Sequence, residues 1–178
     1  MAQVDLASAL DPAYLAGLEG IPLVELRAKR AACIGLETEL SYLRRLAQAR
    51  IDLILDESER RQQGIPQPKK DLVERLPQIL GDYARVEGPG RLPAFLAPPE
   101  GAQLELSSLV EELLPADQLA SLPAVPQERL DELLKTLGLL EREVSTQRRA
   151  LHDILNRLQE ELVRRYRIGE ATVEALLD

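Results

Sequence analysis

The stretch PLVELRAKRAACIGLETELSYLRRLAQARIDLILDESERRQQ, residues 22–63, has a proline at its first position and none after it. Proline is favoured in the first turn of a helix, and Gly64, Pro66 and Pro68 end the segment. We expect one helix of about 40 residues, roughly 60 Å long. Its apolar residues alternate in three- and four-residue steps, which indicates a heptad seam with polar interruptions at Lys29 and Arg50. The seam consists of Leu26, Cys33, Leu36, Leu40, Leu43, Ala47 and Ile54.

A second long helix is predicted over residues 126–168, from Pro126 to the residue before Gly169. Its seam has one polar interruption, Gln147, and consists of Leu130, Leu133, Leu137, Leu140, Val144, Leu151, Ile154 and Leu158. Two helices of similar length with one apolar stripe each can bury those stripes on each other. The sequence therefore predicts an all-α fold in which two long helices form an antiparallel coiled coil. A homodimer that uses the same seams is the alternative arrangement.

The remaining segments are shorter or rich in proline. Residues 1–21 are expected to form an N-terminal arm with at most a short helix, and residues 169–178 a C-terminal tail. Residues 64–125 hold nine of the twelve prolines and read as a Pro/Gly-rich connector with short helices near 70–80 and 104–114. The apolar face of LVEELL, residues 109–114, is a candidate partner surface.

Composition limits the class of protein. Hydrophobic residues make up 45% of the chain and aromatic residues only 3%, which is typical of leucine-rich helices. The net charge of −8 disfavours direct DNA binding, which depends on many phosphate contacts, but suits a basic partner surface. The single cysteine, Cys33, excludes an intrachain disulfide. Because no apolar run approaches the ~20 residues of a membrane span and no signal peptide is evident, we expect a cytoplasmic protein that is not in a membrane.

Enzyme signatures are missing from the sequence. It contains no GxxxxGK[ST], GxSxG or HExxH motif. The only histidine, His152, has no Cys/His cluster around it and cannot form a metal site by itself. The sequence thus predicts a protein that is not an enzyme.

A stripe of polar residues follows one side of the first helix. Its members are four, three, four and four residues apart, so they fall within roughly 80° around a helix. They are Glu37, Ser41, Arg44, Gln48 and Asp52. A solvated face built of helix-stabilising pairs is the simplest explanation of such a stripe, although such faces do not need Ser and Gln in a fixed order.

The second helix repeats this stripe. With Leu36 aligned on Leu140, three of the five positions are identical: Glu141, Ser145 and Arg148. At the other two positions His152 aligns with Gln48, and Asn156 aligns with Asp52. We interpret the match as an internal repeat, which antiparallel packing would place about an approximate twofold axis. Such an axis suits a ligand that has its own twofold symmetry.

The residue types narrow the ligand further. Arginine can donate two hydrogen bonds to guanine O6 and N7 or bind phosphate. A carboxylate can accept from guanine N1–H and the exocyclic amino group, and Ser and Gln supply neutral hydrogen bonds. A guanine nucleotide fits this set. Arg45, Arg149 and Arg50 are instead interpreted as surface or seam-flanking charges.

The pattern E-x3-S-x2-R-x3-Q-x3-D in residues 37–52, together with the run DPAYLAGLEGIPLVELRAKRA before it, resembles the RsiG-type anti-sigma factors of actinobacteria. The resemblance implies an antiparallel coiled coil whose two motifs hold a dimer of cyclic di-GMP. It also implies that the loaded protein sequesters a flagellar-type sigma factor similar to WhiG, which controls sporulation genes, and represses transcription from it. The substitutions His152 and Asn156 depart from the family pattern in the second copy. A ligand-free coiled-coil adaptor or scaffold is the alternative function.

Overall fold

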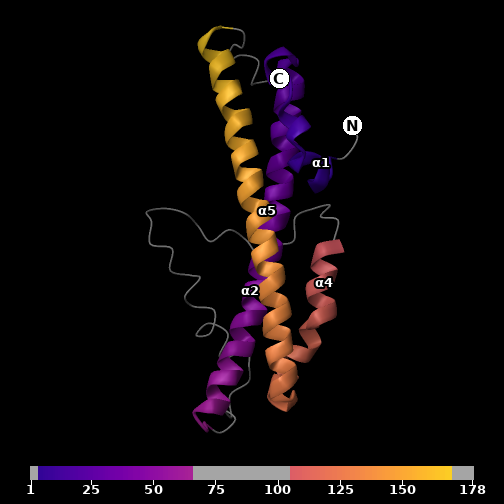
Figure 1. Ribbon diagram of the computed structural model, residues 1–178, viewed down its shortest axis with the longest axis vertical. Helices are drawn as coiled ribbons and strands as arrows, with labels where there is room; N and C mark the ends of the chain where they lie inside the picture. Colours follow the sequence, from indigo (N-terminus) through magenta and orange to yellow (C-terminus); the bar gives the residue numbers. More distant parts are fainter. Residues whose placement is uncertain (1–3, 66–104, 170–178) are drawn as a thin grey trace. The chain divides into compact units, whose positions relative to one another are not determined.

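The computed structural model describes residues 4–65 and 105–169, and every regular element in these two ranges is a helix (Figure 1). The two long helices are α2, Leu23–Gln62, and α5, Gln127–Arg167. Three short helices precede α2: α1 (Leu6–Leu10) and the 3-10 helices η1 (Pro12–Leu15) and η2 (Leu18–Gly20). Before α5 lie α4 (Glu105–Leu113) and the 3-10 helix η4 (Ala116–Ala124). The all-α class and the two long helices are therefore confirmed. The helix expected near 70–80 and most of the 169–178 tail lie outside the described residues.

Local sequence explains where these elements begin. The Asp5 carboxylate caps α1 by accepting from the Ser8 N–H at 2.7 Å, and Asp11 caps η1 in the same way through Ala13. Side-chain caps of this kind satisfy N–H groups that have no partner inside the helix. Pro22 and Pro126 each precede a long helix and accept its first backbone hydrogen bonds.

Glycine ends α2. Gly64 has φ +64°, a left-handed conformation that residues with a Cβ adopt only at a cost. Its N–H donates to Arg61 O, and the next N–H, of Ile65, donates to Arg60 O. This pair of bonds is the Schellman arrangement, which satisfies the last carbonyls of a helix.

The described residues fall into two compact units, each of which contains a part of both long helices. The first unit comprises residues 1–41 and 145–178, and the second comprises residues 42–144. In the first unit the two helices are joined by contacts such as Arg27 Nη2 to Tyr166 Oη at 2.5 Å. In the second unit Arg61 Nη1 approaches Gln127 Oε1 at 3.4 Å. The two long helices therefore pack together within each unit.

Each unit has a leucine-rich core, as the seams predict. The buried apolar residues of the first unit are Ala9, Leu26, Cys33, Leu40, Leu151, Leu158 and Leu162. Those of the second are Leu43, Ala47, Leu53, Ile54, Val110, Leu114, Leu122, Leu130, Leu133, Leu137 and Val144. Burying one such leucine contributes roughly 2 kcal/mol before the entropy cost of ordering the chain. Leu36, Leu140 and Ile154 of the expected seams are only half-buried.

Arg50 corrects one interpretation made from the sequence. It is not a surface or seam-flanking charge, since it is only 4% exposed. Its Nε donates to Leu114 O at 3.0 Å, and its Nη2 bonds the Glu111 carboxylate. The buried guanidinium thereby attaches the end of α4 to α2. The LVEELL face is correspondingly part of the core at Val110 and Leu114, while Leu109 stays exposed.

An arginine near the end of each long helix donates hydrogen bonds to the segment that leads into the other long helix. In the first unit Arg165 donates to Leu18 O at 2.5 Å and Ile21 O at 2.6 Å. In the second unit Arg61 donates to Leu122 O at 3.0 Å and Val125 O at 2.8 Å. The alignment that matches Leu36 to Leu140 also matches these arginines to each other and their acceptors to each other. We call these the two arginine clamps.

A glutamate orients each clamp. Glu161 Oε1 accepts from Arg165 Nε at 2.8 Å, and Glu57 Oε1 accepts from Arg61 Nε at 2.6 Å. Because the glutamates also correspond in the alignment, the internal repeat extends well beyond the polar stripe in both directions.

Candidate functional site

The first copy of the stripe begins in a polar group within the first unit, which we call the Glu37 cluster: Glu37, Ser41, Arg148 and His152. Glu37 Oε1 accepts from Ser41 Oγ at 2.7 Å and from Arg148 Nε at 3.0 Å. Arg148 Nε also lies 3.0 Å from Ser41 Oγ, and His152 Nε2 lies 3.3 Å from the same Glu37 oxygen. Residues from both motif copies thus meet in one cluster, α2 supplying the carboxylate and hydroxyl and α5 the two basic side chains.

A matching group lies within the second unit, and we call it the Glu141 cluster: Arg44, Gln48 and Glu141. Gln48 Nε2 donates to Glu141 Oε1 at 3.1 Å. Arg44 Nη1 lies 3.8 Å from the same oxygen. Here α5 supplies the carboxylate and α2 the arginine and amide.

The two clusters repeat one pattern of contacts. In each, the glutamate of one motif copy pairs with the arginine of the other copy, as Glu37 does with Arg148 and Glu141 does with Arg44. In each, the same glutamate oxygen also meets the fourth residue of the other copy, which is His152 in one cluster and Gln48 in the other. The repeat recognised in the sequence is therefore matched by equivalent pairing of side chains.

Partial exposure leaves both clusters within reach of solvent. The Arg44 and Arg148 side chains are 30% and 32% exposed, and both glutamates are 21% exposed. Burial alone would raise the pKa of Glu37. Hydrogen bonds from Ser41 and Arg148, and the nearby charges of Arg148 and His152, outweigh burial and lower its pKa below the usual value. Glu37 therefore stays a carboxylate, which acts only as a hydrogen-bond acceptor.

Two buried atoms of the Glu141 cluster have no hydrogen-bond partner among residues 4–65 and 105–169: Arg44 Nε, a donor, and Gln48 Oε1, an acceptor. Buried polar atoms are paired in the large majority of cases, and an unpaired one costs about 1–3 kcal/mol. The cluster consequently has one donor and one acceptor available for a further group.

The other three motif residues lie on the same helices. Asp52 and Ser145 are half-buried, and each interacts with another group. Asn156 is exposed on α5, so the fifth position of the stripe differs between the copies in exposure as well as in chemistry. Arg45 and Arg149 are exposed, in agreement with their interpretation as surface charges.

Sequence reasoning did not identify the arginine clamps or the buried role of Arg50. A signal for the clamps was present, because the sequences ESERR (57–61) and ELVRR (161–165) share a glutamate followed four residues later by the clamping arginine. For Arg50 no comparable signal exists, since the corresponding residue of the second helix is Ile154.

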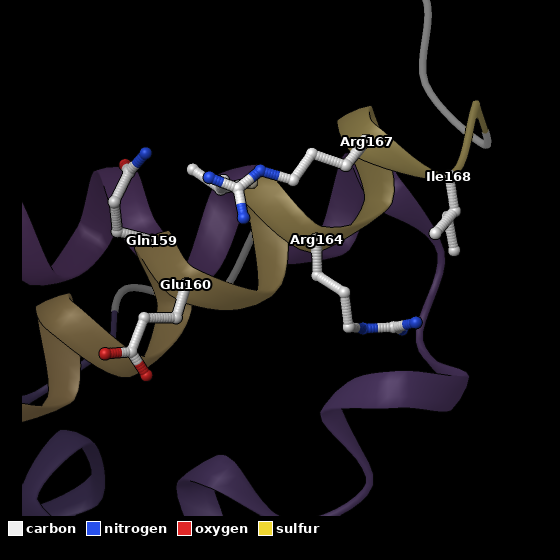
Figure 2. Close-up of a pocket in the computed structure, with 6 residues that line it drawn as sticks. Gln159, Glu160, Arg164, Arg167 and Ile168 are labelled. Atoms are coloured by element: carbon white, nitrogen blue, oxygen red, sulfur yellow. The ribbon is translucent and has the colours of Figure 1, made fainter.

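An open hollow of about 490 Å³ lies near the end of α5 and is separate from both clusters. It is lined by Gln159, Glu160, Val163, Arg164, Arg167 and Ile168. Figure 2 shows the Arg164 and Arg167 side chains leaving the helix in different directions, so the two guanidinium groups do not converge on one point. The hollow contains no motif residue, and the polar clusters remain the better candidate for a binding site.

The described ranges contain neither a metal-binding cluster nor a membrane-spanning helix. No group of three or more His, Cys, Asp or Glu side chains there is arranged to hold a metal ion. None of the helices in these ranges combines the length and apolar character that crossing a membrane requires.

Comparison with known proteins agrees with the pattern of motif residues. Residues 12–80 match the model of the RsiG-like family. This range includes η1, η2, α2 and the whole first copy of the motif. No curated protein matches the chain. The chain thus carries an RsiG-like region over residues 12–80, and this match supports an RsiG-type protein.

Proposed function

We propose that the chain is an anti-sigma factor that binds cyclic di-GMP through its two polar clusters and then sequesters a flagellar-type sigma factor similar to WhiG. The RsiG-like match suggests the anti-sigma role and implies a sigma factor as partner in general. In this proposal the protein acts in the cytoplasm, represses sporulation genes that the sigma factor transcribes, and binds its ligand without catalysing a reaction.

One observation carries the nucleotide part of the proposal: the same glutamate–arginine pairing is built twice, from both copies of the motif, at partly exposed positions. Arginine supplies the planar donor fork that matches guanine O6 and N7 or a phosphate. The glutamate accepts from guanine N1–H and its amino group. Each cluster by itself therefore offers groups that suit a guanine base or a phosphate.

The unpaired atoms of the Glu141 cluster support a polar ligand rather than an apolar one. Arg44 Nε and Gln48 Oε1 are buried, and the described residues supply no partner for either atom. A guanine edge offers both acceptors and donors. Binding it would satisfy both atoms and remove the cost of leaving them unpaired.

The proposal includes an antiparallel coiled coil as the scaffold. Within the first unit, contacts pair Arg27 with Tyr166 and Glu37 with Arg148, so the partner number falls as the α2 number rises. Within the second unit the same holds for Gln48 with Glu141 and Arg61 with Gln127. This order, together with the heptad seams, supports antiparallel packing.

Cyclic di-GMP would act on sigma binding through linkage. If the sigma factor binds the loaded form better, then the sigma factor must raise the affinity for cyclic di-GMP by the same factor. The Glu37–Arg148 and Glu141–Arg44 pairs are contacts that the nucleotide would replace with contacts of its own, so occupancy would change the polar surface of both helices.

A ligand-free coiled-coil adaptor or scaffold is the second candidate function. It is favoured by the pairing of motif charges with each other, as between Glu37 and Arg148, because such pairs also serve simply to join two helices. Under this reading the clusters would be interhelical contacts only, and the protein would bind its partner without a nucleotide.

Calorimetric titration of the full chain with cyclic di-GMP separates the two functions, with GTP and cyclic di-AMP as specificity controls. The titration is run with and without the sigma factor. We expect selective binding of cyclic di-GMP, and its loss in the variants Arg44→Glu and Arg148→Glu. The variants Arg45→Glu and Arg149→Glu are matched controls because they reverse exposed neighbouring charges. Far-UV circular dichroism confirms that all four variants stay helical.

The adaptor function would be supported instead if no cyclic di-GMP bound in either condition while the sigma factor or another partner bound the free chain. Equal loss of binding in the Arg45 and Arg44 variants would also contradict the proposal, since it would show a general charge effect rather than a site.

A further inference from the structure

The two clusters have the same plan but different hydrogen-bond capacity. This difference has a consequence for how a ligand would load them, provided that the proposed cyclic di-GMP binding is correct.

The Glu37 cluster is closed on itself. Ser41, Arg148 and His152 all direct their polar atoms at one oxygen, Glu37 Oε1, at 2.7, 3.0 and 3.3 Å. Arg148 Nε is shared between that oxygen and Ser41 Oγ, so the three groups form a triangle of contacts. A ligand that needs Arg148 Nε or Glu37 Oε1 must first break some of these bonds.

The Glu141 cluster is open by comparison. Its arginine lies 3.8 Å from the Glu141 oxygen, a longer contact than the 3.0 Å of its counterpart. Within the described part of the chain, Arg44 Nε is buried without an acceptor, whereas the equivalent Arg148 Nε has two. No described residue donates to Gln48 Oε1, which is likewise buried. A ligand can form hydrogen bonds to these two atoms without breaking an existing bond at either of them.

The fifth residue of the motif also favours stronger ligand binding by the first copy than by the second. Asp52 in the first copy is a half-buried carboxylate, whereas its counterpart Asn156 is exposed and uncharged. Asparagine lacks the charge that strengthens a hydrogen bond to the guanine N–H groups.

We propose that the two motif copies form unequal subsites for a guanine dinucleotide, with the Glu141 cluster as the tight subsite that fills first and the Glu37 cluster as the weak subsite that fills second. The weak subsite is weak because its own side chains satisfy each other. At low ligand concentration the protein is then half-loaded, and full loading requires a higher concentration.

Calorimetric titration of the full chain with cyclic di-GMP tests the order of loading. We expect two phases whose dissociation constants differ by at least about tenfold, because one additional satisfied buried hydrogen bond is worth about that factor. The matched variants Arg44→Ala and Arg148→Ala assign the phases. Arg44→Ala should remove the tight phase, and Arg148→Ala should remove the weak one.

Smaller changes keep the test valid if an arginine variant unfolds. His152→Gln with Asn156→Asp restores the full motif in the second copy, and it should strengthen the weak phase several-fold while leaving the tight phase unchanged. Gln48→Ala should weaken only the tight phase.

Distinct results refute the subsite proposal and the function on which it rests. Two equal affinities, or loss of the tight phase in Arg148→Ala rather than Arg44→Ala, would overturn the order of loading and leave cyclic di-GMP binding intact. An absence of any binding, with the sigma factor present as well, would overturn the proposed function itself and the subsites with it.

Discussion

The carboxylate of Glu161 should stabilise the protein strongly at neutral pH and lose this effect in acid. It accepts hydrogen bonds from Arg164 at 2.7 Å and 2.8 Å and from the buried Arg165 at 2.8 Å. These bonds lower its pKa from the usual 4.5 to about 2, although burial acts in the opposite direction. A shift of this size corresponds to at most about 3.5 kcal/mol. Because Arg164 is 45% exposed and its pairing is screened by water, we expect about 2 kcal/mol.

Glu161→Gln removes the charge and keeps the shape, so it should lower the free energy of unfolding by about 2 kcal/mol at neutral pH. The pKa of Glu161 is lower in the folded chain than in the unfolded chain. Its contribution is therefore complete above about pH 4.5 and declines as the pH falls toward 2. The difference between the native chain and Glu161→Gln should shrink over that window.

Urea unfolding followed by far-UV circular dichroism at a series of pH values measures this difference. Glu160→Gln is the matched control, because it changes an adjacent, exposed glutamate. The reasoning is refuted if Glu161→Gln and Glu160→Gln have the same stability at neutral pH. It is also refuted if the deficit of Glu161→Gln stays constant down to about pH 3, since the lost energy would then not depend on ionisation.

Two pairs of substitutions should each have unequal effects on stability, and each pair lies in or next to one long helix. Gly35→Ala should raise the free energy of unfolding by about 0.5–1 kcal/mol, because an added Cβ meets no atom within 4 Å in the interior of α2. Gly64→Ala should lower it by about 1 kcal/mol, because φ at Gly64 is +64°. Thermal unfolding compares the two variants, and stabilisation by both would be inconsistent with the left-handed conformation at the end of α2. Leu137→Ala should lower the free energy of unfolding by about 2–5 kcal/mol, because the side chain is fully buried. Leu139→Ala should change it little, because that side chain is 54% exposed. A similar fall of the urea midpoint in both variants would contradict the assignment of the seam.

The long helices could be predicted because a few residues determine them. Pro22 and Pro126 mark the starts, and glycines follow the ends, where local backbone chemistry decides the outcome without tertiary information. The predicted helix over 22–63 is found at Leu23–Gln62. Periodic leucines similarly gave most of the core, since burial of one helical stripe follows from the heptad pattern.

The pairing inside the clusters could not be predicted in the same way. Which glutamate meets which arginine depends on the register between two helices that are far apart in the sequence. Arg50 shows the difficulty most clearly, because a charged residue on a seam is usually read as an interruption. Only the position of the Leu114 carbonyl and the Glu111 carboxylate makes its burial favourable.

The two copies of the internal repeat share the arginine clamps and differ at other positions. The clamps are kept, since Arg61 and Arg165 bind equivalent carbonyls before the opposite helix, and each is held by an equivalent glutamate. In the polar stripe, His152 and Asn156 stand where the first copy has an amide and a carboxylate, and outside the stripe Ile154 stands where the first copy has Arg50. A decline of the second copy in general would be expected to affect the clamp as well as the stripe. Because both clamps keep their contacts while two of the five stripe positions differ, the proposed unequal use of the two motif copies agrees with where the stripe differs.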